Sequence, residues 1–311
     1  MSQAADMAVS VGGVALANPV LAASGTFGYG REYSPYLEPG AIGGLVTKGV
    51  SLEPREGNPP PRIVETACGM LNAIGLANVG LDEFLAHKLP WLAGQPGAVV
   101  VNLYGESIDE FAELAQRLGA EPGVDALELN VSCPNVKEGG MAFGCYTGSV
   151  GEVTAAAVAE AQGKPVWVKL TPNVTDPVPM ALAAAQAGAQ AVSLINTLLA
   201  MAIDAKTRRP KLANVVGGLS GPAIKPVGLR MTWQVAGALK AEHPGVDVVG
   251  LGGIMSGIDA AEYLIAGAKA VQVGTASFTD PTAAGRIAAE LAEYCAEQGV
   301  STAELAGSLR I

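Results

Sequence analysis

The chain is poor in histidine, cysteine and charge. Of its 311 residues, 2 are His, 4 are Cys and 15% are charged, whereas half are hydrophobic. The cysteines at positions 68, 133, 145 and 295 form no Cys-x-x-Cys motif, and no His is spaced as a co-ligand. The sequence therefore predicts no zinc or iron–sulfur site built by this chain. Its net charge of −10 argues against nucleic acid as the main partner, because phosphate binding needs clustered Lys and Arg.

The sequence also gives little sign of export or membrane insertion. No basic stretch followed by an apolar run opens the chain, so we expect no secretory signal, free thiols and a cytoplasmic location. The stretch 177–203 lacks charge and is long enough to span a bilayer. It is rich in Ala and interrupted by Gly188 and Gln190, so we interpret it as a buried helix followed by a buried strand.

What the sequence does have is a series of short apolar runs, each ending in a polar or glycine-rich turn. Such runs are typical of strands covered on both faces. Helical patterns separate most of them: 107–118 opens with a predicted capping box (Ser107, Glu110), a helix after Pro177 closes at Gly188, and 258–266 ends at Gly267. The eight predicted strands are 20–24, 43–48, 98–103, 126–131, 165–170, 191–195, 246–251 and 270–274.

Eight strands alternating with helices predict an α/β fold, a (β/α)₈ TIM barrel formed by a single domain over 1–311. The segments 49–97 and 198–220 are too long for simple loops and are expected to be excursions that build a site. The alternative architecture is an open doubly wound sheet, but no Gly-x-Gly-x-x-Gly follows the first strand.

Polar residues gather where the predicted strands end, which in a barrel is where the chemistry takes place. Gly252-Gly253 and Gly274-Thr275 follow the last two strands, and bare backbone N–H groups there favour a bound phosphate, although glycines can also serve only as turns. The other strand-end residues are Ser24, Lys48, Asn102, Asn130, Cys133, Lys169, Asn196 and Thr197.

Two chemistries fit these residues. Lys48 or Lys169 could form a Schiff base, as in a phosphate-binding aldolase or isomerase barrel. Alternatively, one lysine holds a substrate carboxylate and the other balances charge on a reduced cofactor ring, a hypothesis that the neighbouring asparagines favour. Cys133 is a candidate catalytic base, although most free cysteines are small buried hydrophobes. His87 and His243 are not at strand ends and are interpreted as structural or surface residues.

The motifs, taken in order, resemble those of dihydroorotate dehydrogenase over nearly the whole chain. The form of residues 69–76 is similar to class 1B, the NAD-linked type, and Cys at 133 is similar to the class 1 enzymes. Cys145-Tyr-Thr-Gly departs from the usual Thr-Asp-Pro of the family, in a segment expected to close a lid loop and start a helix. The matching segments are 23–28, 47–50, 57–62, 70–76, 130–135, 169–172, 195–197 and the two glycine pairs.

The resemblance implies FMN, oxidation of (S)-dihydroorotate to orotate in pyrimidine biosynthesis, and Cys133 as the base at C5 while C6 delivers a hydride to the flavin. The residues implied to bind FMN are Ser24, Thr47, Lys48, Asn102, Asn130, Lys169, Ile195, Gly221, Gly252, Gly253, Gly274 and Thr275. Those implied to bind substrate are Lys48, Asn72, Ala73, Ile74, Gly75, Leu76, Asn130, Asn196 and Thr197.

The same resemblance implies a partner. Class 1B enzymes pass electrons to NAD⁺ through a subunit that carries FAD and a [2Fe–2S] cluster, in a heterotetramer of two catalytic and two electron-transfer chains. Two alternatives remain within the flavoproteins: a homodimer that uses fumarate, as in class 1A, and a non-catalytic flavin-binding subunit.

Overall fold

The computed structural model describes residues 5–132 and 143–311. Eight parallel strands close into a barrel in the order β10-β15-β16-β3-β4-β7-β8-β9. Because β10 pairs with both β9 and β15, the sheet has no free edge, so the open doubly wound alternative is wrong. All eight strand predictions and the barrel are confirmed. The strands are β3 (Val20–Ala22), β4 (Gly44–Val46), β7 (Ala98–Leu103), β8 (Ala126–Asn130), β9 (Val166–Lys169), β10 (Ala191–Leu194), β15 (Asp247–Leu251) and β16 (Ala270–Val273).

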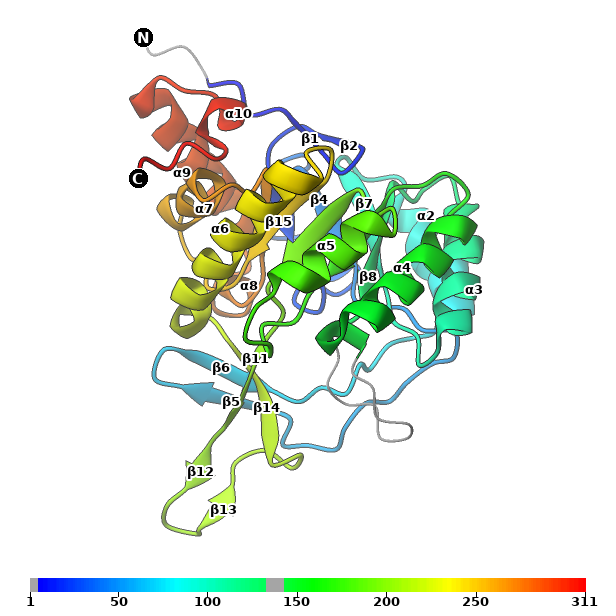
Figure 1. Cartoon of the computed structure of the whole chain (residues 1–311). Coiled ribbons are helices and arrows are strands. Elements are labelled where there is room, and N and C mark those ends of the chain that lie inside the picture. Colours follow the sequence, from blue (N-terminus) through cyan, green and yellow to red (C-terminus); the bar gives the residue numbers. More distant parts are fainter. Residues whose placement is uncertain (1–4, 133–142) are drawn as a thin grey trace.

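Helices surround the barrel and cover its outer face (Figure 1). The six long ones are α3 (Ile108–Gly119), α4 (Thr147–Glu160), α5 (Val178–Gln186), α6 (Lys225–Glu242), α7 (Gly257–Ile265) and α9 (Ala283–Gln298). Shorter turns are η1 (Arg31–Tyr33), α1 (Leu81–Glu83), η2 (Phe84–Lys88), α2 (Leu89–Leu92), η3 (Phe143–Cys145), η4 (Pro222–Ile224), α8 (Ala276–Thr279) and α10 (Thr302–Leu305).

The uncharged stretch 177–203 contains α5 and β10, as predicted, and across residues 5–132 and 143–311 no helix is long and apolar enough to cross a membrane. The predicted capping box of α3 is only half right. The Ser107 hydroxyl accepts the backbone N–H of Glu110 at 3.2 Å, as predicted. The Glu110 carboxylate, however, accepts the N–H of Glu106 at 2.7 Å, one residue before the cap, so the reciprocal bond of a capping box is replaced.

The two long excursions meet in one antiparallel sheet. β5 (Ile63–Thr66) and β6 (Gly69–Asn72) come from the first excursion, and β11 (Leu198–Met201) and β14 (Val216–Ser220) come from the second. Their order is β11-β14-β6-β5, with Leu71 opposite Leu219. This sheet lies across the end of the barrel at which the parallel strands terminate (Figure 1).

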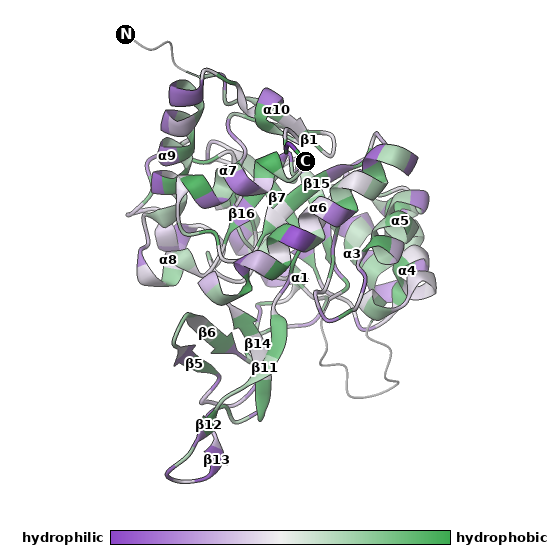
Figure 2. Ribbon diagram, turned by 60° about the vertical axis from the view of Figure 1, so that its left-hand side comes forward, coloured by the Kyte–Doolittle hydropathy of each residue, from purple (hydrophilic) through white to green (hydrophobic). Residues whose placement is uncertain are grey.

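Two hairpins complete the chain. β12 (Ile203–Asp204) and β13 (Arg209–Pro210) project from the four-stranded sheet away from the barrel, with a hydrophilic tip beyond apolar strands β11 and β14 (Figure 2). β1 (Val9–Val11) and β2 (Val14–Leu16) pack against the opposite end of the barrel, where the Trp167 indole N–H donates to the carbonyl of Gly12 at 3.1 Å.

Candidate active site

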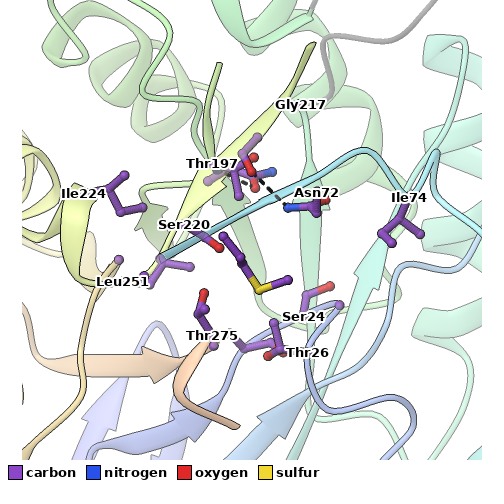
Figure 3. A pocket seen from close by; sticks show the side chains of 18 of the residues that line it. Ser24, Thr26, Asn72, Ile74, Thr197, Gly217, Ser220, Ile224, Leu251 and Thr275 are labelled. Carbon is purple, nitrogen blue, oxygen red and sulfur yellow. Dashed lines mark hydrogen bonds between the residues drawn. The ribbon is translucent and has the colours of Figure 1, made fainter. Parts of the chain in front are cut away.

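A cavity of about 410 Å³ lies between the carboxyl ends of the barrel strands and the four-stranded sheet. Ser24 and Thr275 at the barrel ends face Asn72 and Ser220 of the sheet across it (Figure 3). The structure brings together every predicted binding residue except Thr47. Those lining the cavity are Ser24, Lys48, Asn72, Ala73, Ile74, Gly75, Leu76, Asn102, Asn130, Lys169, Ile195, Asn196, Thr197, Gly221, Gly252, Gly253, Gly274 and Thr275.

Two predicted residues stand apart from this set. Thr47 is fully buried and does not line the cavity, because its hydroxyl accepts the backbone N–H of Asn102 at 3.2 Å and so joins β7 to the end of β4. Cys133 lies outside the described residues. The segment just before it is described: Ser132 follows the end of β8 and is buried.

The Asn130 and Asn196 side chains are tied together at the cavity wall. The Ser132 hydroxyl donates to Asn130 Oδ1 at 2.6 Å, and the Asn196 amide donates to the same oxygen at 3.4 Å. Asn196 Oδ1 in turn accepts the backbone N–H of Thr197 at 2.8 Å. These bonds fix the orientation of both amides, so a planar polar ligand meets a prearranged set of donors and acceptors.

The segment 72–76 is held by the loop that precedes it. The Asn58 backbone N–H donates to the carbonyl of Ile74, and the Asn58 side-chain amide donates to the carbonyl of Ala73, both at 2.9 Å. A Cβ at Gly75 would lie 2.7 Å from the nitrogen of Asn58, and Gly75 has a φ of 75°. Only glycine fits this close approach, which keeps the segment against the cavity.

Both predicted lysines are desolvated. Lys169 is buried on β9, and this burial lowers the pKa of its ammonium group, although the carboxylate of Glu128, with its Oε1 4.0 Å from Lys169 Nζ, acts in the opposite direction. Burial also lowers the pKa of Lys48, helped by the positive charge of Arg62 and opposed by Glu32. Together with Arg62 these lysines give the described cavity lining three basic side chains and no acidic one, which suits an anionic ligand.

Sequence reasoning missed a buried polar cluster beneath the cavity. Glu128 is fully buried and accepts from the Asn102 amide at 2.8 Å, from the Ser193 hydroxyl at 2.7 Å and from the Gln272 amide at 2.7 Å. Glu128 and Gln272 each interrupt an otherwise apolar strand, and that interruption in a strand buried on both faces was the available signal. Arg62 and Asn173 also line the cavity and were not among the predicted site residues.

Glycines close the far end of the cavity after the last two strands, as predicted. Gly253 has a φ of 71°, and a Cβ there would lie 2.7 Å from Lys225 Cβ and 2.8 Å from the carbonyl oxygen of Gly221. The backbone around this point therefore stays bare and can present N–H groups to anionic oxygens. Within residues 5–132 and 143–311, no group of three or more His, Cys, Asp or Glu could hold a metal ion.

The fold and site define a (β/α)₈-barrel protein with a polar, cation-containing ligand cavity at the carboxyl ends of its strands and a glycine cradle after strands seven and eight. Residues 6–295 match the family model for dihydroorotate dehydrogenase. The chain belongs to the dihydroorotate dehydrogenase family.

Relatives named "dihydroorotate dehydrogenase B (NAD(+)), catalytic subunit" match almost end to end. The one from Geobacter sulfurreducens is 57% identical over 310 residues, covering 99% of this chain and all of that protein. The one from Trichlorobacter lovleyi is 58% identical over 295 residues, 95% of each chain. The crystal structure of the Eimeria tenella enzyme in complex with ferulenol superposes with a TM-score of 0.80 at 22% identity, over 97% of this chain and 88% of that one, and so supports the fold.

Proposed function

We propose that the chain is the catalytic subunit of an NAD⁺-linked dihydroorotate dehydrogenase, which oxidises (S)-dihydroorotate to orotate in pyrimidine biosynthesis. The observation that carries this proposal is the 57% identity, over 310 residues, to a protein named as that subunit. The cavity supports it, because the residues that the family resemblance implied for cofactor and substrate gather there from all eight barrel strands and the added sheet.

The cavity suits FMN, and we propose that the whole chain, 1–311, forms one FMN-binding domain. The glycine cradle around Gly221, Gly253 and Gly274 suits a phosphate. At the other end, Asn102 Oδ1 and Gln272 Oε1 are buried and have no hydrogen-bond partner in the described part of the chain. These acceptors suit a ring edge that carries an N–H donor, as the isoalloxazine imide does.

Bound FMN would supply the hydride acceptor for C6 of dihydroorotate. The residues of this chain do the rest in the proposed mechanism. Cys133 removes the proton from C5, Lys48 holds the substrate carboxylate, and Asn72, Asn130 and Asn196 orient the ring edges. Lys169, protonated, stabilises negative charge at the cofactor end of the cavity.

This proposal is tested by purifying the full-length chain. We expect a yellow protein that releases FMN on denaturation and whose visible absorbance bleaches when dihydroorotate is added without oxygen. Bound flavin that dihydroorotate fails to bleach would support a non-catalytic flavin subunit instead. A colourless protein that borohydride traps on Lys48 or Lys169 with a carbonyl substrate would support the aldolase or isomerase alternative.

Replacement of Cys133 tests the assignment of the base. A general base contributes about 10²–10⁴-fold to rate, so Cys133→Ala is expected to lower the rate of flavin reduction at least ~100-fold while FMN stays bound. Cys68→Ala, at an exposed free thiol, serves as the matched control and should reduce its flavin at the wild-type rate. A Cys133→Ala protein with full turnover contradicts the assignment.

We further propose that electrons leave through a partner subunit that carries FAD and a [2Fe–2S] cluster, in a cytoplasmic complex of two chains of each kind. The names of the relatives, which specify NAD⁺ and a catalytic subunit, support this. The exposed side chains of Leu199, Met201 and Ile203 on β11 and β12 offer an apolar surface for assembly.

Co-purification is the test of this assembly. We expect an iron- and FAD-containing partner to elute with the chain, and NAD⁺ reduction by dihydroorotate to require both. A homodimer that reduces fumarate by itself would show instead that the chain behaves like class 1A.

A further inference from the structure

Beneath the cavity, Glu128 occupies a position that is costly for a carboxylate unless it has partners. It lies in the middle of β8, is fully buried and does not line the cavity. Buried acidic side chains are rare without such pairing. Glu128 has such partners. Three hydrogen-bond donors from β7, β10 and β16 converge on its two oxygens, and Lys169 Nζ lies 4.0 Å from its Oε1.

The chemistry of this carboxylate determines which way its neighbours face. An ionised carboxylate only accepts hydrogen bonds, so Asn102 and Gln272 must each turn their NH₂ group toward it. Their carbonyl oxygens are therefore turned away from Glu128. Both residues line the cavity, and neither oxygen has a hydrogen-bond donor within residues 5–132 and 143–311.

We infer that Glu128 is a positioning residue: it fixes the amides of Asn102 and Gln272 so that the cavity floor presents two acceptors, which select a ring edge carrying an N–H donor. This inference rests on the proposed function, because the ring it assigns to the floor is the flavin imide. Glu128 itself touches no ligand and acts through the two amides and through its charge on Lys169.

The substitution Glu128→Gln reverses this arrangement with almost no change of volume. If the new NH₂ replaces Oε1, Asn102 must flip to accept from it; if it replaces Oε2, Ser193 can rotate but Gln272 must flip. In either case one amide turns its NH₂ group to the cavity and repels a ring N–H. Ser193→Ala is the matched control, because it removes one bond to Glu128 without forcing an amide to flip.

The experiment compares the dissociation constants of FMN and 3-methyl-FMN, whose N3 cannot donate, on the flavin-free full-length chain, with unfolding temperatures recorded alongside. The wild-type chain is expected to prefer FMN by about tenfold or more, since the methyl analogue leaves buried acceptors unpaired. Ser193→Ala should keep that preference. Glu128→Gln should reduce it to within about threefold, even if both variants lose similar thermal stability.

A Glu128→Gln protein with the wild-type preference overturns the inference. If this variant does not fold, Gln272→Met replaces it in the test, because it removes one acceptor and leaves Glu128 in place. Gln272→Met should also lower the preference for FMN over 3-methyl-FMN, and an unchanged preference would overturn the inference as well. Wild-type chain that binds FMN but does not discriminate against the methyl analogue refutes the inference alone. Wild-type chain that binds neither flavin refutes the proposed function.

Discussion

At the scale of single residues, the cavity places Lys48 and Lys169 under different constraints. Lys169 is buried and has a carboxylate near it, whereas Lys48 is half-buried beside the cationic Arg62. Desolvation lowers the pKa of both ammonium groups, and it is opposed by the charge of Glu128 at Lys169 and by that of Glu32 at Lys48. Each lysine holds an anion only while it is protonated. The activity should therefore fall at alkaline pH, where the lysines lose their protons.

Lys48 provides the pH prediction. Because its pKa is lowered, it loses its proton at a lower pH than an ordinary lysine, so the KM for dihydroorotate should rise with pH on the alkaline side. A cysteine base acts only as the thiolate, and an ordinary free thiol has a pKa of about 8.5, so kcat/KM should first rise with pH and then fall. Lys48→Arg, which stays charged, should retain the rising limb and move the falling limb to higher pH.

The matched control for this prediction is Lys206→Arg, at an exposed turn between β12 and β13, which should leave the profile unchanged. Steady-state kinetics across the pH range measure both limbs. A falling limb that persists unshifted in Lys48→Arg would assign it to another group.

At the scale of elements, the four-stranded sheet converts two remote excursions into one wall of the site. Its strands β14 and β6 pair so that Gly218 lies opposite Asn72, and the Asn72 amide donates to the carbonyl of Gly218 at 3.3 Å. Gly218 also passes close to Thr197, at the start of the second excursion. The positions of Asn72 and Thr197 therefore depend on β14, which has a glycine, and so no side chain, at position 218.

Gly218→Ala tests this dependence. The new Cβ would lie 2.0 Å from Thr197 Oγ1 and 2.5 Å from Thr197 Cβ, so either Thr197 or β14 must move. We expect a destabilisation of about 1–3 kcal/mol by overpacking and a higher KM for dihydroorotate, with FMN still bound. Thermal unfolding and steady-state kinetics measure these effects.

Gly237→Ala is the control, because Gly237 is exposed on α6 and a Cβ there meets nothing within 4 Å. It should stabilise the helix by about 0.5–1 kcal/mol and leave the KM unchanged. Equal effects of the two substitutions would show that the tight approach of Gly218 is unimportant.

At the scale of the whole molecule, the cavity exists only where the barrel and the added sheet meet. The barrel ends supply both lysines and the glycines Gly253 and Gly274 of the cradle, and the sheet supplies Asn72 and Ser220 opposite them (Figure 3). A ligand that fills this space contacts both layers and so stabilises the folded state by mass action.

FMN should therefore raise the unfolding temperature of the flavin-free chain. At 100 times its dissociation constant, a ligand adds about 2.7 kcal/mol, which for a chain of this size corresponds to roughly 4 °C. Riboflavin, which lacks the phosphate, should give a smaller shift at the same concentration if the glycine cradle holds that group. Equal shifts for the two flavins, measured by calorimetry, would contradict the phosphate assignment.

Much of this organisation could be predicted from the sequence. Consecutive apolar positions indicated all eight barrel strands, and the polar residues that end them, such as Lys48, Asn130 and Lys169, do line one cavity. These predictions succeeded because the carboxyl ends of parallel strands meet at one end of a barrel whatever lies between them. Thr47 does not line the cavity, because alternate residues of a strand end face opposite ways and its hydroxyl accepts a hydrogen bond from β7.

The strands, the helices between them and the end of the barrel at which the chemistry belongs follow from the amino-acid sequence alone, because periodicity and strand ends are local features. The pairing of residues 63–72 and 198–220 in one sheet is visible only in the folded chain, since strand pairing between remote segments has no signal in the local sequence. The role of Glu128 also depends on the folded structure. A carboxylate in an apolar strand has no explanation in the local sequence, whereas in the folded chain Asn102, Ser193 and Gln272 donate to it from three other strands.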